Sequence, residues 1–291
     1  CCLRLYHHPR RWFYLLAGAA TGLAAATKLT GGLVALVLVT AHLLRLMHKP
    51  DVSAPDLPRP RRHRLLGLGL LAALVTFLLI SSHIFWELPR FWTSVVEHLQ
   101  FGSQGYKGLQ MAPGSGWGFY WTVLGWGIGW TMLLASVAAG GLVLWQRHPQ
   151  GIIVAILPLI LFSSMGAQKI LFARFILPAV PLLVLLVSLS LTWLEGRWSF
   201  WQRHPALLWP LIVAILLAQP LTNLVWFNHL LTLPDTRELA TEWVTRNFPE
   251  NTVVTKESYA IFPNRFLIDQ TWPYKTIHID ERGPTRNRVD H

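Results

Sequence analysis

The chain has 291 residues, of which 53% are hydrophobic and only 13% are charged. A soluble domain is about a quarter charged, so this composition excludes an ordinary soluble protein and predicts a polytopic membrane protein. The net charge of +11 would suggest nucleic-acid binding in a soluble protein. Here most cations lie in loops beside apolar segments, where anionic lipid headgroups and membrane orientation explain them, so we expect no nucleic-acid partner. Cys1 and Cys2 are the only cysteines, which excludes a disulfide framework and a thiolate metal site, and we expect no metal or other cofactor.

Apolar segments follow one another along most of the chain and predict an all-α membrane bundle of about seven transmembrane helices. They cover residues 12–27, 29–46, 65–84, 119–146, 152–167, 171–194 and 206–227. The first and fifth segments would span only ~24 Å of a hydrocarbon core about 30 Å thick. We therefore assign 1–227 to a transmembrane domain and 228–291 to a separate C-terminal domain.

The distribution of cations between the loops predicts the orientation in the membrane. One set of loops contains Arg4, Arg10, Arg11, Arg45, Lys49, Arg59, Arg61, Arg62, Arg64, Arg147, Arg197 and Arg203. The other set contains Lys28, Arg90, Lys107, Lys169 and Arg174. Twelve cations against five place the first set in the cytoplasm, and the C-terminal tail then lies outside. We expect a protein of a bacterial plasma membrane with an extracytoplasmic tail.

Three of the outward cations are candidates for binding an anion. Lys169 and Arg174 precede the apolar run that ends near Leu194, and Lys28 lies in the tight turn between the first two segments. An arginine presents bidentate donors to a phosphate and a lysine presents a mobile point charge. A cation within a membrane region is a functional-site hypothesis by default. For Lys28 the alternative is a lysine that snorkels from a helix end to the interface.

The loop 85–118 is predicted to lie on the outer side. Its first part places Phe91, Trp92 and Val95 at helical spacing, as in an amphipathic helix lying in the interface. Its second part is rich in glycine and aromatic residues, and either covers a carbohydrate or polyprenyl site or is only a connector. The candidate substrate-contacting residues in this loop are His98, Tyr106 and Lys107.

The tail predicts a small α/β domain. Asp235 and Glu238 have the spacing of a capping box, and the helix that they start ends near Asn247. Residues 252–255 and 275–279 have the composition of short strands.

Four stretches, in this order, carry a resemblance to a known family. They are Gly18 to Gly32 with its Thr-Lys pair; Gly105-Tyr-Lys-Gly108 followed by Pro113 and Phe119-Tyr-Trp121; Arg174-Phe-Ile-Leu-Pro178 with Pro181; and Asp235 to Trp243 followed by Asn247-Phe-Pro249 and Glu257. With these stretches the chain resembles the GT-C membrane glycosyltransferases, specifically the superfamily of protein O-mannosyltransferases and lipid A aminoarabinose transferases. Lys107 departs from the family pattern, which often has other residues there.

The resemblance implies transfer of a sugar from a polyprenyl-phosphate-linked donor to a protein, lipid or glycan acceptor on the outer face. It also implies that an acidic residue of the first outer loop acts as the base. The chain begins with Cys rather than Met, and we expect that this loop lies upstream of residue 1. Of the outer carboxylates in the membrane part, Glu87 and Glu97, only Glu97 is kept as a weak candidate for the base. On this interpretation Lys28, Lys169 and Arg174 bind the donor phosphate.

Two other classes of function remain open. A transporter or flippase of an anionic lipid or solute would use the outward cations equally well, although inverted repeats are not evident in the sequence. A non-catalytic membrane subunit that binds a partner through its tail is the other alternative.

Overall fold

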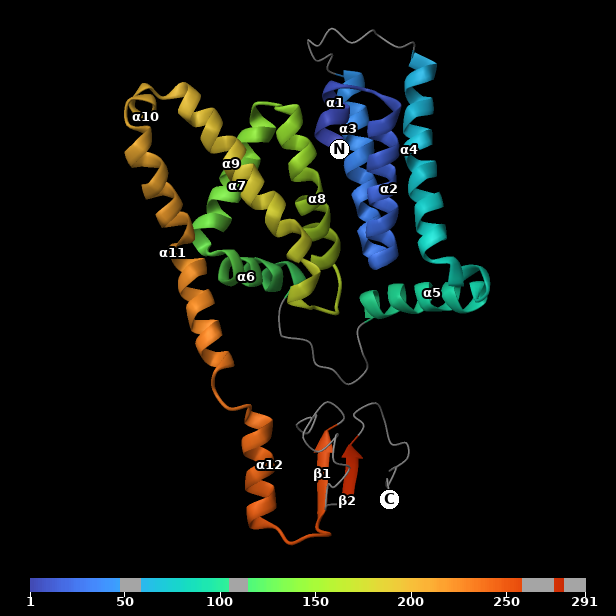
Figure 1. The fold of residues 1–291 in the computed structure, drawn as a ribbon, viewed down its shortest axis with the longest axis vertical. Helices are drawn as coiled ribbons and strands as arrows, with labels where there is room; N and C mark the ends of the chain where they lie inside the picture. The colour runs from blue at the N-terminus through green and yellow to red at the C-terminus, as the bar shows by residue number, and fades with distance from the viewer. Residues whose placement is uncertain (48–58, 105–114, 258–274, 280–291) are drawn as a thin grey trace. The chain divides into compact units, whose positions relative to one another are not determined.

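The computed structural model describes residues 1–47, 59–104, 115–257 and 275–279, and most of these are helical (Figure 1). The α-helices are α1 (Cys2–His7), α2 (Arg11–Thr27), α3 (Val34–Met47), α4 (Arg59–Ile80), α5 (Leu88–Gln104), α6 (Gly116–Ile128), α7 (Trp130–Trp145), α8 (Pro149–Gly166), α9 (Val180–Arg197), α10 (Ser199–Arg203), α11 (Pro205–Leu231) and α12 (Thr236–Asn247). Short 3-10 helices are η1 (Leu29–Leu33), η2 (Ser82–Phe85), η3 (Ala173–Phe175) and η4 (Leu177–Ala179). The strands are β1 (Val253–Glu257) and β2 (Lys275–Ile279).

Five helical segments of the described chain are long and apolar enough to cross a membrane. They are Leu29–Met47, His63–Ile80, Pro149–Gly166, Ala173–Arg197 and Pro205–Leu231, and the bent pair of α6 and α7 makes six if it counts as one span. The chain is therefore compatible with an integral membrane protein.

The first expected span is short, as predicted, because the 17 residues of α2 reach only about 26 Å, less than a typical hydrocarbon core. Another span differs from the prediction. Segment 119–146 is not one continuous helix, because α6 and α7 meet at an angle of 115°.

The break between α6 and α7 occurs at Gly129, whose φ of 89° and ψ of 142° are accessible essentially only to glycine. The break frees backbone groups that a lipid environment cannot satisfy. Gln219 of α11 satisfies two of them: the Trp130 N–H donates to Gln219 Oε1 at 2.8 Å, and Gln219 Nε2 donates to the Gly125 carbonyl at 3.4 Å. The bend is therefore stabilised from another helix, which the hydrophobic pattern of 119–146 does not reveal.

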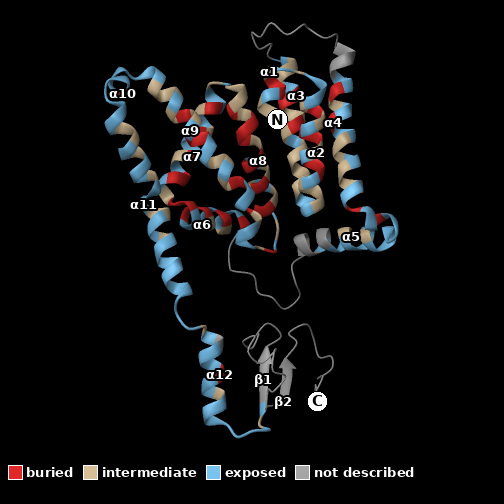
Figure 2. Ribbon diagram, in the orientation of Figure 1, coloured by how far each residue is buried: buried red, intermediate tan, exposed pale blue. Residues whose placement is uncertain are grey.

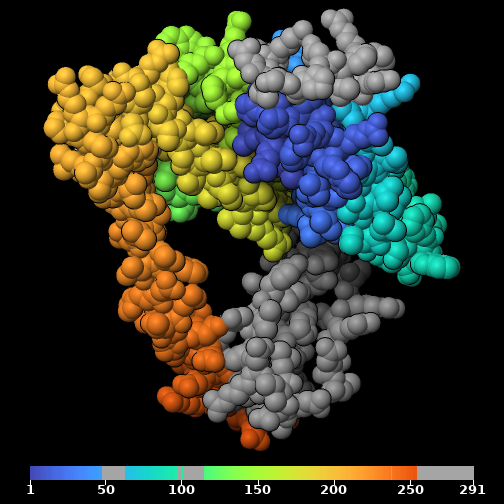
Figure 3. Space-filling model, turned by 45° about the horizontal axis from the view of Figure 1, so that its top comes forward, coloured from blue at the N-terminus to red at the C-terminus, as the bar shows by residue number. Residues whose placement is uncertain are grey.

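Helices α2 and α4 lie side by side (Figure 3), and their backbones approach closely at glycines of α2. A Cβ atom added to Gly18 would lie 1.9 Å from the carbonyl oxygen of Gly69, and one added to Gly22 would lie 2.3 Å from that of Ala73. Gly18 and Gly22 are four residues apart on one face of α2, the small-residue spacing that lets membrane helices approach closely. The close approach therefore depends on the missing side chains.

The helices differ in how far they are buried (Figure 2). The main core is formed by α6, α7, α8 and α9, and a smaller one by α1, α2, α3 and the start of α4. By contrast α11 has no buried residue. Within the described part of the chain, the surface of α11 is therefore largely uncovered by other helices.

The connections between helices alternate between two ends of this bundle (Figure 1). The reversals after α2 and α8 lie at one end, and those after α7 and α9 lie at the other. This grouping agrees with the two sets of loops inferred from charge. Which end faces the cytoplasm stays a prediction.

The expected interfacial helix in loop 85–118 is confirmed as a helix, α5, and residues 105–114 lie outside the described residues. By contacts the chain separates into two compact units, with the division within α11 between Pro220 and Leu221. Of the second unit the structure describes the end of α11, α12, and β1 paired in parallel with β2, with Val253 opposite Lys275. A complete α/β domain at 228–291 stays a prediction.

Candidate functional site

Two of the predicted anion-binding cations, Lys28 and Arg174, come together although they are far apart in the sequence. Lys28 Nζ lies over the ring of Phe175, 3.8 Å from its centroid, and the guanidinium carbon of Arg174 lies 5.8 Å from the same centroid. Arg174 also lies over Phe172 at 4.6 Å. Each cation–π contact of this kind contributes about 0.5–1 kcal/mol at an exposed position. Phe175 therefore gathers two like charges around one aromatic ring.

Local backbone structure presents both cations at a helix boundary. Lys28 is the residue where α2 ends and η1 begins, and its extended backbone interrupts the helical path. Arg174 lies in η3, in the irregular segment that precedes α9. The Tyr120 hydroxyl donates to the Phe172 carbonyl at 3.3 Å, which attaches this segment to α6.

The charges of this site are not neutralised by a carboxylate of the described residues. Within the described residues, Lys28, Lys169 and Arg174 have no carboxylate at ion-pair distance. Partial burial, and secondarily the positive charge of Arg174, lower the pKa of Lys28 below its ordinary value of 10.5. An anion bound between the two cations would relieve the repulsion between them.

An apolar cavity of about 390 Å³ has Ile176, the residue that follows Phe175, in its lining. Helices α6, α7, α8 and α9 line most of it, and Ala179 and Leu183 also contribute to its wall. Ile176 follows Phe175 in the chain and is only 1% exposed. The segment 174–176 thus connects a cationic surface to an apolar interior, an arrangement that suits an amphipathic anion.

The remaining predicted site residues are not brought to this pair. Lys169 is exposed in the connection between α8 and η3, and no contact joins it to Lys28 or Arg174 among the described residues. The His98 side chain, Tyr106 and Lys107 lie outside the described residues. Glu97 is exposed on α5. Glu87 pairs with Arg90 at 3.1 Å, an exposed contact close to the start of α5.

The hydrophobic sequence pattern did not indicate the roles of Phe172, Phe175 and Tyr120. A possible signal was present in Phe172-Ala-Arg-Phe175, where aromatic residues flank the arginine. The second partner of Phe175, Lys28, could not be inferred without the fold.

Comparisons with protein-family models, with curated proteins and with solved structures found no match to this chain.

Proposed function

We propose that the protein is an integral membrane glycosyltransferase that transfers a sugar from a polyprenyl-phosphate-linked donor to an acceptor on the outer membrane face. The observation that carries this proposal is the pairing of Lys28 and Arg174 over Phe175 beside an apolar cavity. The resemblance to GT-C glycosyltransferases supplies the reaction class. In this proposal the C-terminal tail is extracytoplasmic.

The chemistry requires cations at the phosphate. Breaking the bond between sugar and lipid phosphate leaves a phosphate whose negative charge increases toward the transition state, and fixed cations lower the barrier most where charge develops. Arg174 is suited to two phosphate oxygens and Lys28 to a third. The lipid chain of the donor would enter the apolar cavity lined by Ile176.

A base for the acceptor is not assigned to a described residue. Glu87 is already paired with Arg90. Glu97 is exposed on the interfacial helix, where it is suited to binding an acceptor. The base therefore remains an expectation from the family resemblance.

A transporter of an anionic lipid is the second candidate, and the broken pair α6 and α7 favours it. Discontinuous helices at membrane depth are common in transporters, where half-helix ends face the substrate. Here, however, Gln219 occupies the free groups of the break. The backbone groups at the break are therefore less available to a transported ion.

One pair of assays separates the candidates. Membranes containing the protein are given a polyprenyl-phosphate-linked radiolabelled sugar, and transfer of label to acceptors is measured in wild type and in Lys28→Ala/Arg174→Ala. Transfer that the double substitution abolishes supports the glycosyltransferase. Movement of a fluorescent polyprenyl phosphate across vesicles without cleavage would instead support a transporter, and neither activity would favour a non-catalytic subunit.

A further inference from the structure

The short turn that carries Arg174 is attached to the helical core by few contacts. None of the residues 172–175 is buried, and Phe172 is 43% exposed. Ile176, which follows, is the first buried residue after the turn. The turn itself is closed by the Phe175 N–H, which donates to the Phe172 carbonyl at 3.0 Å. Because hydrogen-bond geometry is poor in such short 3-10 turns, contacts from outside the turn decide where Arg174 lies.

The same carbonyl accepts a second hydrogen bond from a tyrosine of α6. The Tyr120 hydroxyl donates to the Phe172 oxygen at 3.3 Å, and a carbonyl oxygen has two lone pairs that can serve both donors. Within the described part of the chain, no other side chain forms a hydrogen bond with residues 172–175. Tyr120 therefore contacts the one backbone atom that closes the turn.

Tyr120 is itself held in a fixed position. Its side chain is 0% exposed and belongs to the core formed by α6, α7, α8 and α9. One helical turn earlier, Gly116 packs on the end of α8, where an added Cβ atom would lie 2.3 Å from the Gly166 carbonyl oxygen. Close packing of this kind leaves a side chain little freedom. The Tyr120 hydroxyl can therefore transmit the rigidity of the core to an exposed turn.

The position of the turn affects both cations of the anion site. The guanidinium carbon of Arg174 lies 4.6 Å from the ring centroid of Phe172. The rings of Phe172 and Phe175 meet edge to face with 5.3 Å between their centroids, and Lys28 Nζ lies over the Phe175 ring. A shift of the Phe172 backbone would therefore change the aromatic contacts of both cations.

We infer that Tyr120 is a positioning residue of the anion site: its hydroxyl, acting through the Phe172 carbonyl, fixes the turn that presents Arg174 beside Lys28. Tyr120 is fully buried and does not itself bind the anion. This role deepens the proposed function and rests on it for the identity of the anion, a polyprenyl phosphate. It does not require the transfer reaction.

The test uses Tyr120→Phe, which removes one oxygen atom and keeps the ring, in the whole protein reconstituted in phosphatidylcholine nanodiscs. Polyprenyl phosphate is titrated against this substitution, once with Arg174 present and once in the Arg174→Ala background. With Arg174 present, binding should weaken by about two- to tenfold, the range for one neutral hydrogen bond. In the Arg174→Ala background the factor should be smaller, because no guanidinium remains to be positioned. Unchanged binding, or the same loss in both backgrounds, would overturn the inference.

Tyr14→Phe is the matched control for the loss of a buried tyrosine hydroxyl. Tyr14 is 1% exposed in the smaller core, and its hydroxyl is hydrogen-bonded to His42 Nδ1 at 2.8 Å. This substitution should lower Tm as Tyr120→Phe does but leave the affinity for polyprenyl phosphate at the wild-type value. If Tyr14→Phe weakens binding as much as Tyr120→Phe, the effect is a general loosening of the fold and the positioning role is wrong.

A measurement without ligand separates this inference from the proposed function. Lysines are labelled by reductive methylation with 13C-formaldehyde, and the NMR signal of Lys28 is assigned by its absence in Lys28→Arg. Burial and the charge of Arg174 lower the pKa of Lys28, so a loosened turn in Tyr120→Phe should raise this pKa toward its ordinary value. If the wild-type protein binds no polyprenyl phosphate, the proposed function fails. The pKa of Lys28 then still decides the inference: a rise supports the positioning role, and an unchanged pKa overturns it.

Discussion

The ring of Phe175 lies close to two positively charged side chains. It holds Lys28 at 3.8 Å and Arg174 at 5.8 Å, so two positive charges share one neutral partner. Cation–π attraction to the ring opposes the repulsion between the two cations. Partial burial, and secondarily the charge of Arg174, lower the pKa of Lys28. A bound phosphate would meet both charges at once, and each charged hydrogen bond contributes about 1.5–3 kcal/mol.

The first prediction concerns Arg174. Arg174→Ala should weaken the binding of a polyprenyl phosphate by about 1.5–3 kcal/mol, measured by titration in nanodiscs. Arg174→Lys should recover only part, because a lysine lacks the bidentate fork. Lys169→Ala is the matched comparison and should have a smaller effect, since Lys169 has no contact with the pair in the described structure. An Arg174→Ala protein that binds like wild type would exclude this residue from the phosphate site.

The second prediction concerns pH. Burial and the charge of Arg174 lower the pKa of Lys28, so its ammonium is lost at a lower pH than that of an ordinary lysine. Phosphate binding should therefore be strongest above the second phosphate pKa of about 6 and should decline as pH rises through the lowered pKa of Lys28. Arg174→Gln removes the second cause of the shift and should move this alkaline decline upward. An alkaline midpoint that Arg174→Gln leaves in place would contradict the coupling.

The lowered pKa of Lys28 also determines whether the stability of the fold rises or falls with pH. Between the lowered pKa and 10.5 the unfolded chain carries a proton at Lys28 that the folded chain has released. Stability therefore rises with pH across that window, and below it the charged lysine opposes folding. Because Lys28 is exposed, solvent screening keeps this effect small.

Among the elements, the contact of α2 with α4 is the most sensitive to side-chain volume. The third prediction is that Gly22→Leu lowers the stability of the bundle by about 1–3 kcal/mol or separates the two helices, because the new side chain meets the backbone of α4. Thermal unfolding of the purified protein measures this. Gly67→Leu on α4 is the control, since a Cβ at Gly67 meets nothing within 4 Å. Equal Tm losses in the two variants would show that the glycine contact is not special.

The fourth prediction tests Gln219. Gln219→Leu keeps the side-chain volume but leaves the Trp130 N–H and the Gly125 carbonyl without the partners described above. We expect a loss of about 1–3 kcal/mol in stability, the cost of an unsatisfied buried polar group. Gln202→Leu is the comparison, because its amide bonds the Gly196 carbonyl at an exposed position. If Gln202→Leu destabilises the protein as much, the break does not depend on Gln219.

The periodic spacing of apolar residues predicted a helix correctly where the apolar residues lie on one face of that helix. Helix α5 was predicted from the spacing of its apolar residues, and helix α12 from its apolar face and the helix start at Asp235. The break at Gly129 could not be predicted in this way. Glycines are common in membrane helices, and the partner that stabilises this break is on α11, far along the chain.

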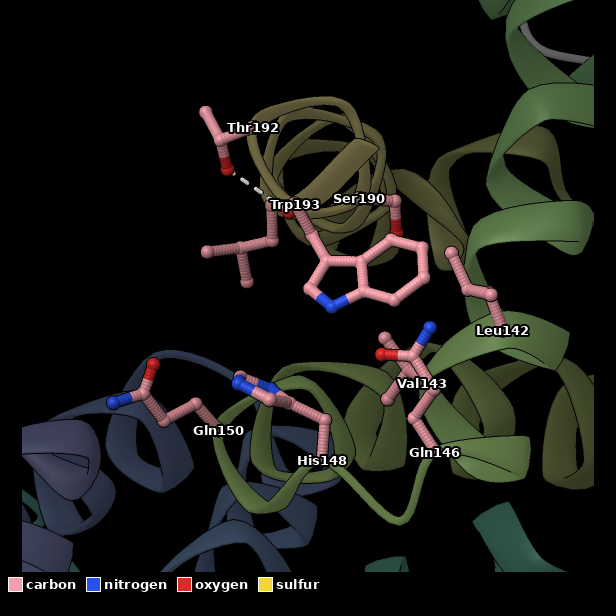
Figure 4. A pocket seen from close by; sticks show the side chains of 9 residues that line it. Leu142, Val143, Gln146, His148, Gln150, Ser190, Thr192 and Trp193 are labelled. Atoms are coloured by element: carbon pink, nitrogen blue, oxygen red, sulfur yellow. Dashed lines mark hydrogen bonds between the residues drawn. The ribbon is translucent and has the colours of Figure 1, made fainter. Parts of the chain in front are cut away.

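For the molecule as a whole, the candidate site was partly predictable. Lys28, Lys169 and Arg174 were notable in the sequence because they oppose the charge bias of the loops, and the fold unites two of them. It does not unite the third. A smaller cavity beside Trp193 (Figure 4) was not predicted, because its lining residues Gln146, His148 and Ser190 lie just after α7, just before α8 and within α9.

The fifth prediction concerns orientation. A reporter that is active only in the cytoplasm should be silent when fused after Val225 and active when fused after Arg203, since residues 205–225 of α11 lie between these positions. The charge bias of the loops is the physical reason. An active reporter after Val225 would invert the topology and place the cations of Lys28 and Arg174 at the cytoplasmic face.

The dependence of the bend on Gln219 imposes an order on the biogenesis of the protein. Gln219 is synthesised 89 residues after Trp130, which takes roughly 4–18 s at 5–20 residues per second. During that interval the α6–α7 region is present without the side chain that satisfies its break. A straight helix would satisfy these groups internally in lipid, so residues 116–145 can enter the bilayer as one rod. We expect the bend at Gly129 to form when α11 arrives.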